Sequence, residues 1–209
     1  MIRVSATSQQ NSLVSSNFLE TIKVLDGKVC NLSYHQERLE SVLDSLETLK
    51  SYDLSLLISP PQQGLYRCRV IYNSQEIDIS YLEYTKREVK SFKLIYDDTI
   101  VYDKKYAQRN LIDECFSKKS DSDEIIIVKN GLITDTSIAN IALYDGERWL
   151  TPKSPLLQGT TRRRYLDKGK IVEEDISVEK LKSYKKIALM NAMIDFDIIA
   201  EENIEEIIC

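Results

Sequence analysis

The sequence predicts an α+β fold, and three observations lead to that class. Helical and strand-like patterns alternate irregularly, without the regular strand–helix repeats of a doubly wound parallel sheet. Three two-residue hairpin signals, Asp26-Gly27, Asn130-Gly131 and Asp145-Gly146, join runs rich in apolar residues. The chain has 209 residues, 43% of them hydrophobic and 29% charged, which is enough for one or two domains with cores of their own.

The first half of the chain is expected to hold a hairpin, a helix and three strands. Residues 18–32 read as a hairpin around Asp26-Gly27, because glycine tolerates the positive φ of a tight turn. Residues 33–50 read as a helix in which Ser33 caps the first turn and Gln36 completes a capping box. Its expected apolar face consists of Leu39, Val42, Leu43, Leu46 and Leu49. Residues 65–72 and 77–84 are expected to pair as strands, followed by a strand at 91–97.

The second half is expected to be richer in strands. Residues 109–119 read as a short helix, 124–152 as a meander of three strands, and 156–169 as a loop that enters a helix. A coarse boundary near residue 95 then gives an α+β domain at 1–95 and a β-rich domain at 96–209. No self-similar repeat and no segment with the composition of a disordered linker is visible.

Composition argues against several classes of function. The net charge of −5 disfavours a nucleic-acid platform, because phosphate backbones are held by a surplus of Lys and Arg. No apolar run is long enough to span a membrane and residues 1–10 lack the apolar core of a signal peptide, so we expect a cytoplasmic protein. A single histidine, His35, rules out a His-rich metal site, and no metal ion is expected. The cysteines form no C-x-x-C pair and are expected to be reduced: Cys30, Cys68, Cys115 and Cys209.

Two adjacent lysines, Lys104 and Lys105, lie between a strand-like run and a predicted helix. If the strand continued through them, their side chains would point to opposite faces, so both amines could not enter one pocket. A lysine is a nucleophile only when it is neutral, which burial and a nearby cation favour. We therefore expect only one of the two to do chemistry.

Two further stretches allow more than one interpretation. Gly159, Thr160 and Thr161 precede a predicted helix, where free backbone N–H groups could hold an anion or where the residues simply cap the helix. Asp135 lies among apolar residues of the meander. It is either a turn residue or a buried carboxylate that faces a cationic ring nitrogen. Spacing alone leaves both alternatives open.

Several motifs in order resemble the class IV pyridoxal-phosphate enzymes, which include branched-chain and D-amino-acid aminotransferases and aminodeoxychorismate lyase. The motifs are the His-x-x-Arg at 35–38, the lysine, the Asp-x-Ser-x-x-Asn at 135–140, the Thr-Pro at 151–152, the Gly-Thr-Thr-Arg at 159–162 and the Asn-Ala-Met at 191–193. The resemblance covers residues 18 to 197. It implies a shortened, two-domain D-amino-acid-aminotransferase-like fold (fold type IV), pyridoxal 5'-phosphate as cofactor, a small-molecule substrate and a homodimer.

The resemblance also assigns roles to individual residues. Arg38 matches the arginine that holds the cofactor phosphate, and Lys105, four residues before Arg109, matches the lysine that bears the cofactor. Asp135 matches the acid that pairs with the pyridine nitrogen, where the family usually has Glu. Arg109 is expected to bind substrate. Further cofactor-binding residues implied by the resemblance are Asn140, Thr160, Thr161, Asn191 and Ala192.

The runs Ala139-Asn140-Ile141 and Asn191-Ala192-Met193 look more like aminodeoxychorismate lyase than like the aminotransferases. The implied reaction converts 4-amino-4-deoxychorismate to 4-aminobenzoate and pyruvate. Two alternatives remain. One is a class IV amino-acid aminotransferase that acts on branched-chain or D-amino acids. The other is a non-catalytic relative that has lost the cofactor, which the Asp-for-Glu exchange at position 135 and the short chain leave open.

Overall fold

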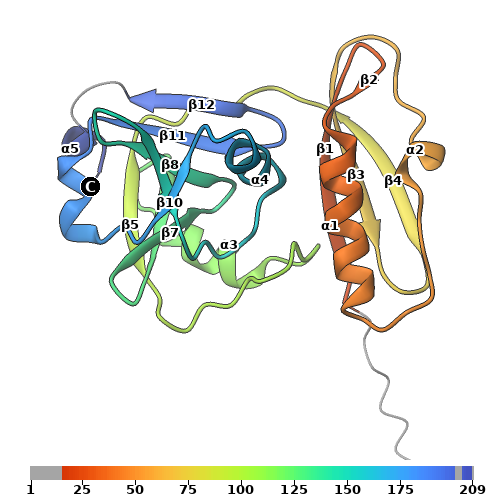
Figure 1. Cartoon of the computed structure of the whole chain (residues 1–209), viewed down its shortest axis with the longest axis horizontal. Coiled ribbons are helices and arrows are strands. Elements are labelled where there is room, and N and C mark those ends of the chain that lie inside the picture. Colours follow the sequence, from red (N-terminus) through yellow and green to blue (C-terminus); the bar gives the residue numbers. More distant parts are fainter. Residues whose placement is uncertain (1–15, 201–203, 209) are drawn as a thin grey trace, which may run out of the picture.

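The computed structural model describes residues 16–200 and 204–208. Residues 1–10, in which no apolar core of a signal peptide was found, therefore lie outside the described residues, and so does Cys209. Two sheets stand side by side, one of four strands and one of eight (Figure 1). The mixed composition of sheets and a few short helices confirms the α+β class.

The smaller sheet is built from residues 18–83. Its strands run antiparallel in the order β2-β1-β3-β4, with β1 at Phe18–Leu25, β2 at Lys28–Val29, β3 at Leu65–Tyr72 and β4 at Ile77–Glu83. Helix α1 (Leu32–Asp44) packs on one face of this sheet, and the short α2 (Leu54–Leu57) follows it. Asp26 and Gly27 join β1 to β2 with φ values of 46° and 76°, so the predicted hairpin is confirmed.

The predicted start of α1 was wrong. The helix begins at Leu32, directly after Asn31, whose φ of 51° turns the chain out of the hairpin. Ser33 therefore lies inside the first turn and does not cap it. The side chain of Gln36 donates to the carbonyl of Tyr52 at 2.8 Å and not to the helix start. A capping box needs its Ser one residue before the helix, and here the turn geometry places Asn31 in that position.

The predicted end of α1 was also wrong. The helix ends at Asp44, and Glu47 takes a φ of 53°, which a continuing helix cannot accommodate. Leu46 and Leu49 lie beyond this point and are exposed. The helix therefore buries an apolar face that stops at Leu43.

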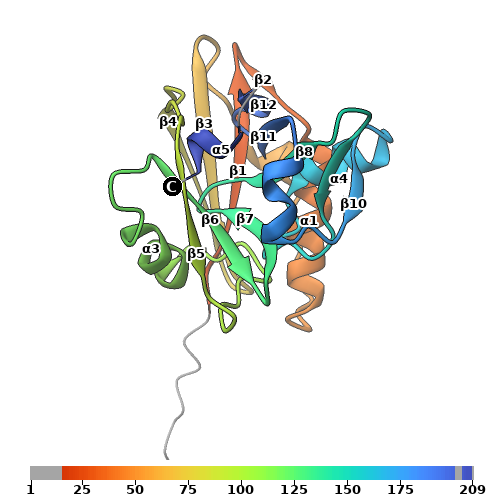
Figure 2. The same cartoon turned by 90° about the vertical axis from the view of Figure 1, so that its left-hand side faces the viewer.

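The larger sheet has the strand order β10-β9-β8-β7-β6-β5, with β11 paired to β8 and to β12. Its strands are β5 (Phe92–Tyr96), β6 (Glu124–Lys129), β7 (Leu132–Thr136), β8 (Asn140–Tyr144), β9 (Trp149–Pro152), β10 (Val172–Glu174), β11 (Lys186–Asn191) and β12 (Asp195–Ala200). The helices are α3 (Asn110–Ser117), α4 (Thr160–Asp167), the 3-10 helix η1 (Val178–Ser183) and α5 (Ile204–Ile207). Figure 2 shows α3 beside β5 and β6.

The predicted three-stranded meander is in fact four strands. The run 132–144 is interrupted after Thr136, whose side-chain oxygen accepts a hydrogen bond from the N–H of Ala139 at 3.0 Å. The chain thereby reverses at 137–139, and Asp135 on β7 faces Asn140 on β8. A side-chain-closed turn of this kind leaves little trace in an apolar pattern.

The division of the chain at residue 95 stays a prediction. β5 pairs in parallel with β6, from Phe92↔Glu124 to Tyr96↔Val128. Residues 92–95 therefore belong to the larger sheet, and the change from one sheet to the other lies between Glu83 and Phe92.

Candidate active site

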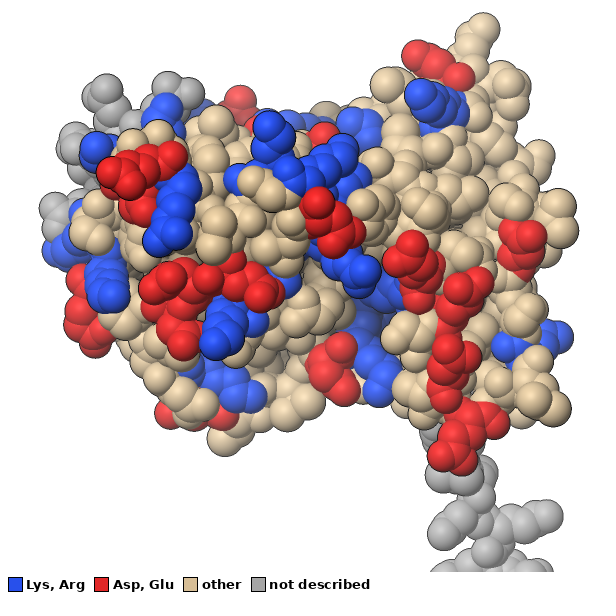
Figure 3. All heavy atoms as spheres, in the orientation of Figure 1, with Lys and Arg blue, Asp and Glu red and all other residues tan. Residues whose placement is uncertain are grey.

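A cavity of about 380 Å³ lies between the two sheets. Every residue that the sequence assigned to the site lines it: Arg38, Lys105, Arg109, Asp135, Asn140, Thr160, Thr161, Asn191 and Ala192. These residues come from α1, β7, β8, α4, the end of β11 and the turn after it, and the segment before α3. Figure 3 shows Lys and Arg gathered between α1 and the part built on the larger sheet.

Lys105 lies in an irregular segment that β1 holds in place. Its carbonyl accepts a hydrogen bond from the N–H of Leu19 at 2.7 Å. Burial of the amine, and next the positive charge of Arg38, lower the pKa of Lys105 to about 8. A substantial fraction of this amine is therefore neutral near physiological pH, as a nucleophilic lysine requires.

Lys104 has different surroundings. Its Nζ lies 3.6 Å from a carboxylate oxygen of Asp103, and its side chain is 30% exposed. It does not line the large cavity, although it borders a smaller one of about 250 Å³. As expected, only one of the two lysines lines the large cavity. Strand alternation is not the reason, because β5 already ends at Tyr96.

A buried carboxylate that the sequence analysis missed holds Arg38. Glu20 on β1 is 0% exposed, and its two oxygens accept from Nε and Nη2 of Arg38 at 2.7 and 2.6 Å. His35, one helical turn before Arg38, donates from Nδ1 to Glu20 at 2.6 Å. Burial opposes ionisation of Glu20, but the charge of Arg38 and the two partners' hydrogen bonds lower its pKa to about 2.

The arrangement of Glu20, His35 and Arg38 fixes the arginine at the cavity wall. Burial lowers the pKa of His35, so the neutral ring acts as an Nδ1–H donor. The described bonds of Arg38 use Nε and Nη2, which leaves Nη1 as the donor for a further anion. A signal was present in the sequence, because Glu20 lies two residues from both Phe18 and Ile22 and so shares the buried face of β1 with them.

Asp135 is a strand residue with a buried carboxylate, so it is not the turn residue that the sequence also allowed. Its side chain accepts from Nδ2 of Asn140 at 2.7 Å and from the N–H of Leu157 at 2.9 Å. Burial raises the pKa of Asp135 to about 6, against the lowering effect of these hydrogen bonds. The group is mostly ionised at pH 7 and, within the cavity, can pair with a cationic ring nitrogen.

Asn140 positions Asp135 and the loop before α4. Besides Asp135, its amide nitrogen donates to the carbonyl of Leu157 at 2.8 Å. A Cβ on Gly159 would lie 1.9 Å from Oδ1 of Asn140, so only glycine lets the loop come this close. The close approach brings the start of α4 to the cavity, where the N–H groups of Thr160 and Thr161 have no acceptor within the helix.

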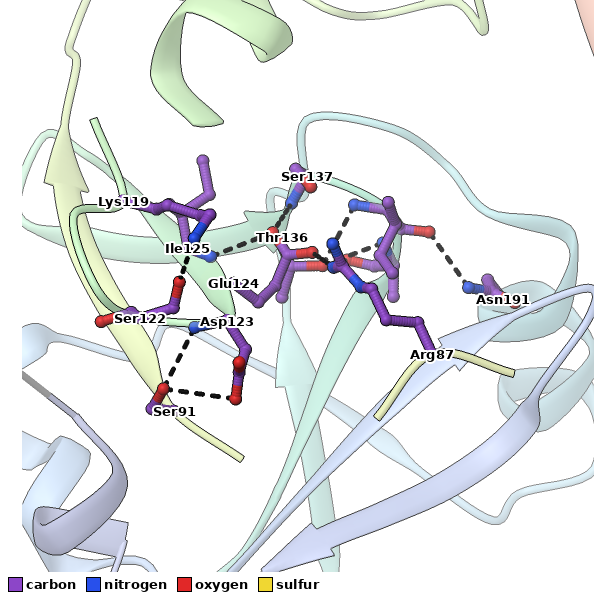
Figure 4. A network of polar contacts seen from close by, with 12 residues as sticks. Arg87, Ser91, Lys119, Ser122, Asp123, Glu124, Ile125, Thr136, Ser137 and Asn191 are labelled. Carbon is purple, nitrogen blue, oxygen red and sulfur yellow. Dashed lines mark hydrogen bonds and ion pairs between the residues drawn. The ribbon is translucent and has the colours of Figure 1, made fainter. Parts of the chain in front are cut away.

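Two other contacts shape the rim at residues 137–139, and both are drawn in Figure 4. Glu124, 0% exposed and paired with Arg87, accepts from the N–H of Ser137 at 3.2 Å. Asn191 donates from Nδ2 to the carbonyl of Ile138 at 3.2 Å, and its Oδ1 accepts from the N–H of Met193 at 2.9 Å. The amide of Asn191 therefore fastens two segments of the cavity wall to each other.

The arginine run after Thr161 is partly structural. Arg162 is 2% exposed and donates to the carbonyl of Pro152 at 2.8 Å, to Glu173 at 2.6 Å and to Gln158 at 2.8 Å. It thus ties the loop before α4 to β9 and β10. Within the part of the chain that the structure describes, Cys30, Cys68 and Cys115 are free thiols, and no helix there is both long and apolar enough to cross a membrane.

Residues 99–200 match the family described as amino-transferase class IV. An uncharacterized protein of Haemophilus influenzae is 37% identical over 180 residues, which make up 83% of this chain and 96% of that protein. A protein of Haemophilus somnus 129pt, whose crystal structure is named as that of a putative 4-amino-4-deoxychorismate lyase, is 34% identical in sequence. The two structures match with a TM-score of 0.80 over 85% of this chain and 96% of that chain. The PLP-bound form of a hypothetical aminotransferase from Mycobacterium tuberculosis shares the fold, with a TM-score of 0.74 at 16% identity over 90% of this chain and 81% of that one.

The fold is that of pyridoxal-phosphate-dependent enzymes, in a shortened form, as the sequence predicted. With its lysine, buried carboxylate and motifs in the expected order, the chain belongs to the amino-transferase class IV family. The family implies pyridoxal phosphate, and the cavity has groups suited to each part of it. These are the amine of Lys105 for an aldehyde, Asp135 for a cationic ring nitrogen, and Arg38 with the start of α4 for a phosphate.

Proposed function

We propose that this chain is a pyridoxal-phosphate-dependent lyase that converts 4-amino-4-deoxychorismate to 4-aminobenzoate and pyruvate. The reaction breaks the C–H bond of the ring carbon that bears the amine. It also breaks the bond between the neighbouring ring carbon and the oxygen of the enolpyruvyl group. The ring becomes aromatic and the released enol becomes pyruvate, so no co-reactant is consumed.

The observation that carries the lyase is the likeness of 85% of this chain to the Haemophilus somnus protein named as a putative lyase of this kind. A Schizosaccharomyces pombe protein named as a putative aminodeoxychorismate lyase is also 32% identical, over 88 residues that make up 37% of that protein. The runs Ala139-Asn140-Ile141 and Asn191-Ala192-Met193 support the same choice.

In this proposal the residues that line the cavity have separate roles in the reaction. The bound cofactor supplies an electron-withdrawing ring for the carbon that bears the substrate amine. Lys105 holds the cofactor and, once free, takes the proton from that carbon through Nζ. Asp135 holds the positive charge on the ring nitrogen, and Arg38 binds the phosphate. Thr160 and Thr161 offer the phosphate their backbone N–H groups.

Four further residues act on the site in other ways. Asn140 keeps the carboxylate of Asp135 in place through a 2.7 Å hydrogen bond. Asn191 and Ala192 form part of the cavity wall, and the side-chain amide of Asn191 donates to the carbonyl of Ile138. Arg109 lines the cavity as the proposed substrate residue, but its guanidinium also pairs with Asp113 at 3.0 Å.

The alternative is a class IV amino-acid aminotransferase with the same lysine moving the proton. The deciding experiment gives the purified protein 4-amino-4-deoxychorismate and follows pyruvate and 4-aminobenzoate. In parallel, amino transfer from branched-chain and D-amino acids to a keto acid is followed. Equal amounts of pyruvate and 4-aminobenzoate without a keto acid support the lyase. Keto-acid-dependent amino transfer without either product would show the aminotransferase instead.

The second alternative, a relative that has lost the cofactor, is tested by absorbance. Protein purified with pyridoxal phosphate should be yellow and should lose the colour after Lys105→Ala. A colourless protein that takes up no cofactor would support this alternative. We also propose a homodimer from the family resemblance, a cytoplasmic location from the composition, and two domains that meet near residue 95; sedimentation analysis tests the dimer.

A further inference from the structure

Two arginines on β3 face the cavity and have no role in the proposed reaction so far. Arg67 and Arg69 are two residues apart, so the alternation of a strand puts both side chains on the same face of the smaller sheet. Both line the cavity. The opposite face of β3, with Cys68, Val70 and Tyr72, is buried in the core. The sheet therefore presents Arg67 and Arg69 to the site.

Neither arginine is neutralised by the strands beside it. Arg67 has Lys23 directly opposite on β1 and Leu82 on β4, while Arg69 lies between Thr21 and Ser80. A like charge directly across a strand pair destabilises a sheet, so the Lys23–Arg67 pair costs stability. Among residues 16–200 and 204–208, neither arginine makes an ion pair or side-chain hydrogen bond with another residue. Nε of Arg67 is moreover buried without a partner, which is costly for a charged group.

The charged residues that line the cavity indicate what kind of ligand Arg67 and Arg69 would bind. Five cationic residues line it: Arg38, Arg67, Arg69, Lys105 and Arg109. The acidic residue that lines it is Asp135, Glu20 already holds Arg38, and Asp113 holds Arg109. In the proposed function the cofactor phosphate takes Arg38 and the ring nitrogen takes Asp135. Besides Arg109, whose guanidinium also pairs with Asp113, two positive charges on β3 are then left for the substrate.

We propose that Arg67 and Arg69 form a carboxylate-binding subsite on β3 that makes the cavity select a ring compound with two carboxylates over one with a single carboxylate. This inference rests on the proposed function, because it concerns the same cavity and its substrate. A guanidinium binds a carboxylate through two parallel N–H groups, so each arginine can take one carboxylate. Substrates of amino-acid aminotransferases with one carboxylate and an apolar side chain would leave one arginine unpaired in the cavity.

The experiment measures binding of chorismate, which carries both carboxylates but has a hydroxyl in place of the reacting amine. It is compared with 4-hydroxybenzoate, which has one carboxylate. Calorimetric titrations use the full chain with pyridoxal phosphate and the variants Arg67→Gln, Arg69→Gln and the double variant. Arg148→Gln is the matched control, because Arg148 is an exposed arginine that does not line the cavity.

The parent and Arg148→Gln should bind chorismate more tightly than 4-hydroxybenzoate. Each single variant should lose roughly 10- to 100-fold in chorismate affinity, as expected for a lost hydrogen-bonded charge. The double variant should bind chorismate no better than 4-hydroxybenzoate. Arg67→Lys and Arg69→Lys should recover part of the affinity, and circular dichroism identifies any variant that fails to fold, in which case the lysine variants carry the test.

Unchanged chorismate affinity in folded Gln variants, or no preference for chorismate in the parent, would overturn the inference. Its failure differs from failure of the proposed function. If the protein releases pyruvate from 4-amino-4-deoxychorismate while the variants bind chorismate as the parent does, the subsite is wrong and the lyase stands. If chorismate binds through both arginines but no pyruvate is released, the subsite stands and the lyase is wrong.

Discussion

Replacing each of the adjacent lysines in turn tests the chemistry of the cavity most directly. Lys105→Ala should abolish attachment of pyridoxal phosphate, because Lys105 is the lysine that lines the large cavity together with Arg38 and Asp135. Lys104→Ala is the matched control, since Lys104 is a neighbour of the same type that pairs with Asp103 outside that cavity. Borohydride reduction followed by peptide mapping should place the cofactor on Lys105 in the parent and in Lys104→Ala.

The magnitude of the effect follows from the protonation of the amine. With a pKa of about 8, Lys105 is neutral in about a quarter of molecules at pH 7.5, whereas a lysine at the ordinary 10.5 is neutral in about one in a thousand. Burial lowers the pKa, the charge of Arg38 lowers it further, and the charge of Glu20 opposes both. Arg38→Gln should therefore raise the pKa of Lys105, and Glu20→Gln should lower it.

Competitive labelling with trace acetic anhydride between pH 6 and 11 measures this pKa on cofactor-free protein, with Lys105 read by mass spectrometry. The labelling of Lys105 should reach half its maximum near pH 8. The midpoint should move to higher pH in Arg38→Gln and to lower pH in Glu20→Gln. A midpoint near 10.5 in the parent, or shifts of the same sign in both variants, would refute the reasoning. A cofactor label on Lys104 would show that the wrong lysine was chosen.

Three other predictions concern the groups around Lys105. Asp135→Ala should still attach the cofactor but lose most turnover, while Asp135→Glu should keep substantial activity. In the parent protein, turnover should fall as the pH drops through about 6, because the carboxyl group of Asp135 takes up a proton there. Turnover of Asp135→Ala close to that of the parent would remove Asp135 from the site. Arg38→Gln should weaken cofactor binding by about 1.5–3 kcal/mol, with activity restored by excess cofactor, and equal affinity in equilibrium dialysis would contradict a phosphate-binding role. Glu20→Gln should lower the free energy of unfolding by about 3–5 kcal/mol in urea titrations, because it leaves the largely buried guanidinium of Arg38 without its anion. An unchanged urea midpoint would mean that the pair contributes little.

The sequence predicted best what neighbouring residues determine. The Asp26-Gly27 turn formed as expected, because its positive φ values are properties of those two residues. The short helix before β6 and the loop that enters α4 were also found, since apolar spacing and Gly159 mark them locally. The extent of α1 was not, because Asn31 and Glu47 set its ends through backbone conformations that the leucine pattern does not reveal.

The sequence by itself determined the class of fold and, through the order of its motifs, which residues to look for in the site. Only the tertiary structure decided what those residues contact. Glu20 reaches Arg38 across 18 positions, and Asp135 meets the N–H of Leu157 across 22. The pKa of a buried group depends on desolvation and on charges brought close in space, and neither is fixed by spacing along the chain. For the same reason the two arginines of β3 read as ordinary polar strand positions until the two sheets enclosed them around one cavity.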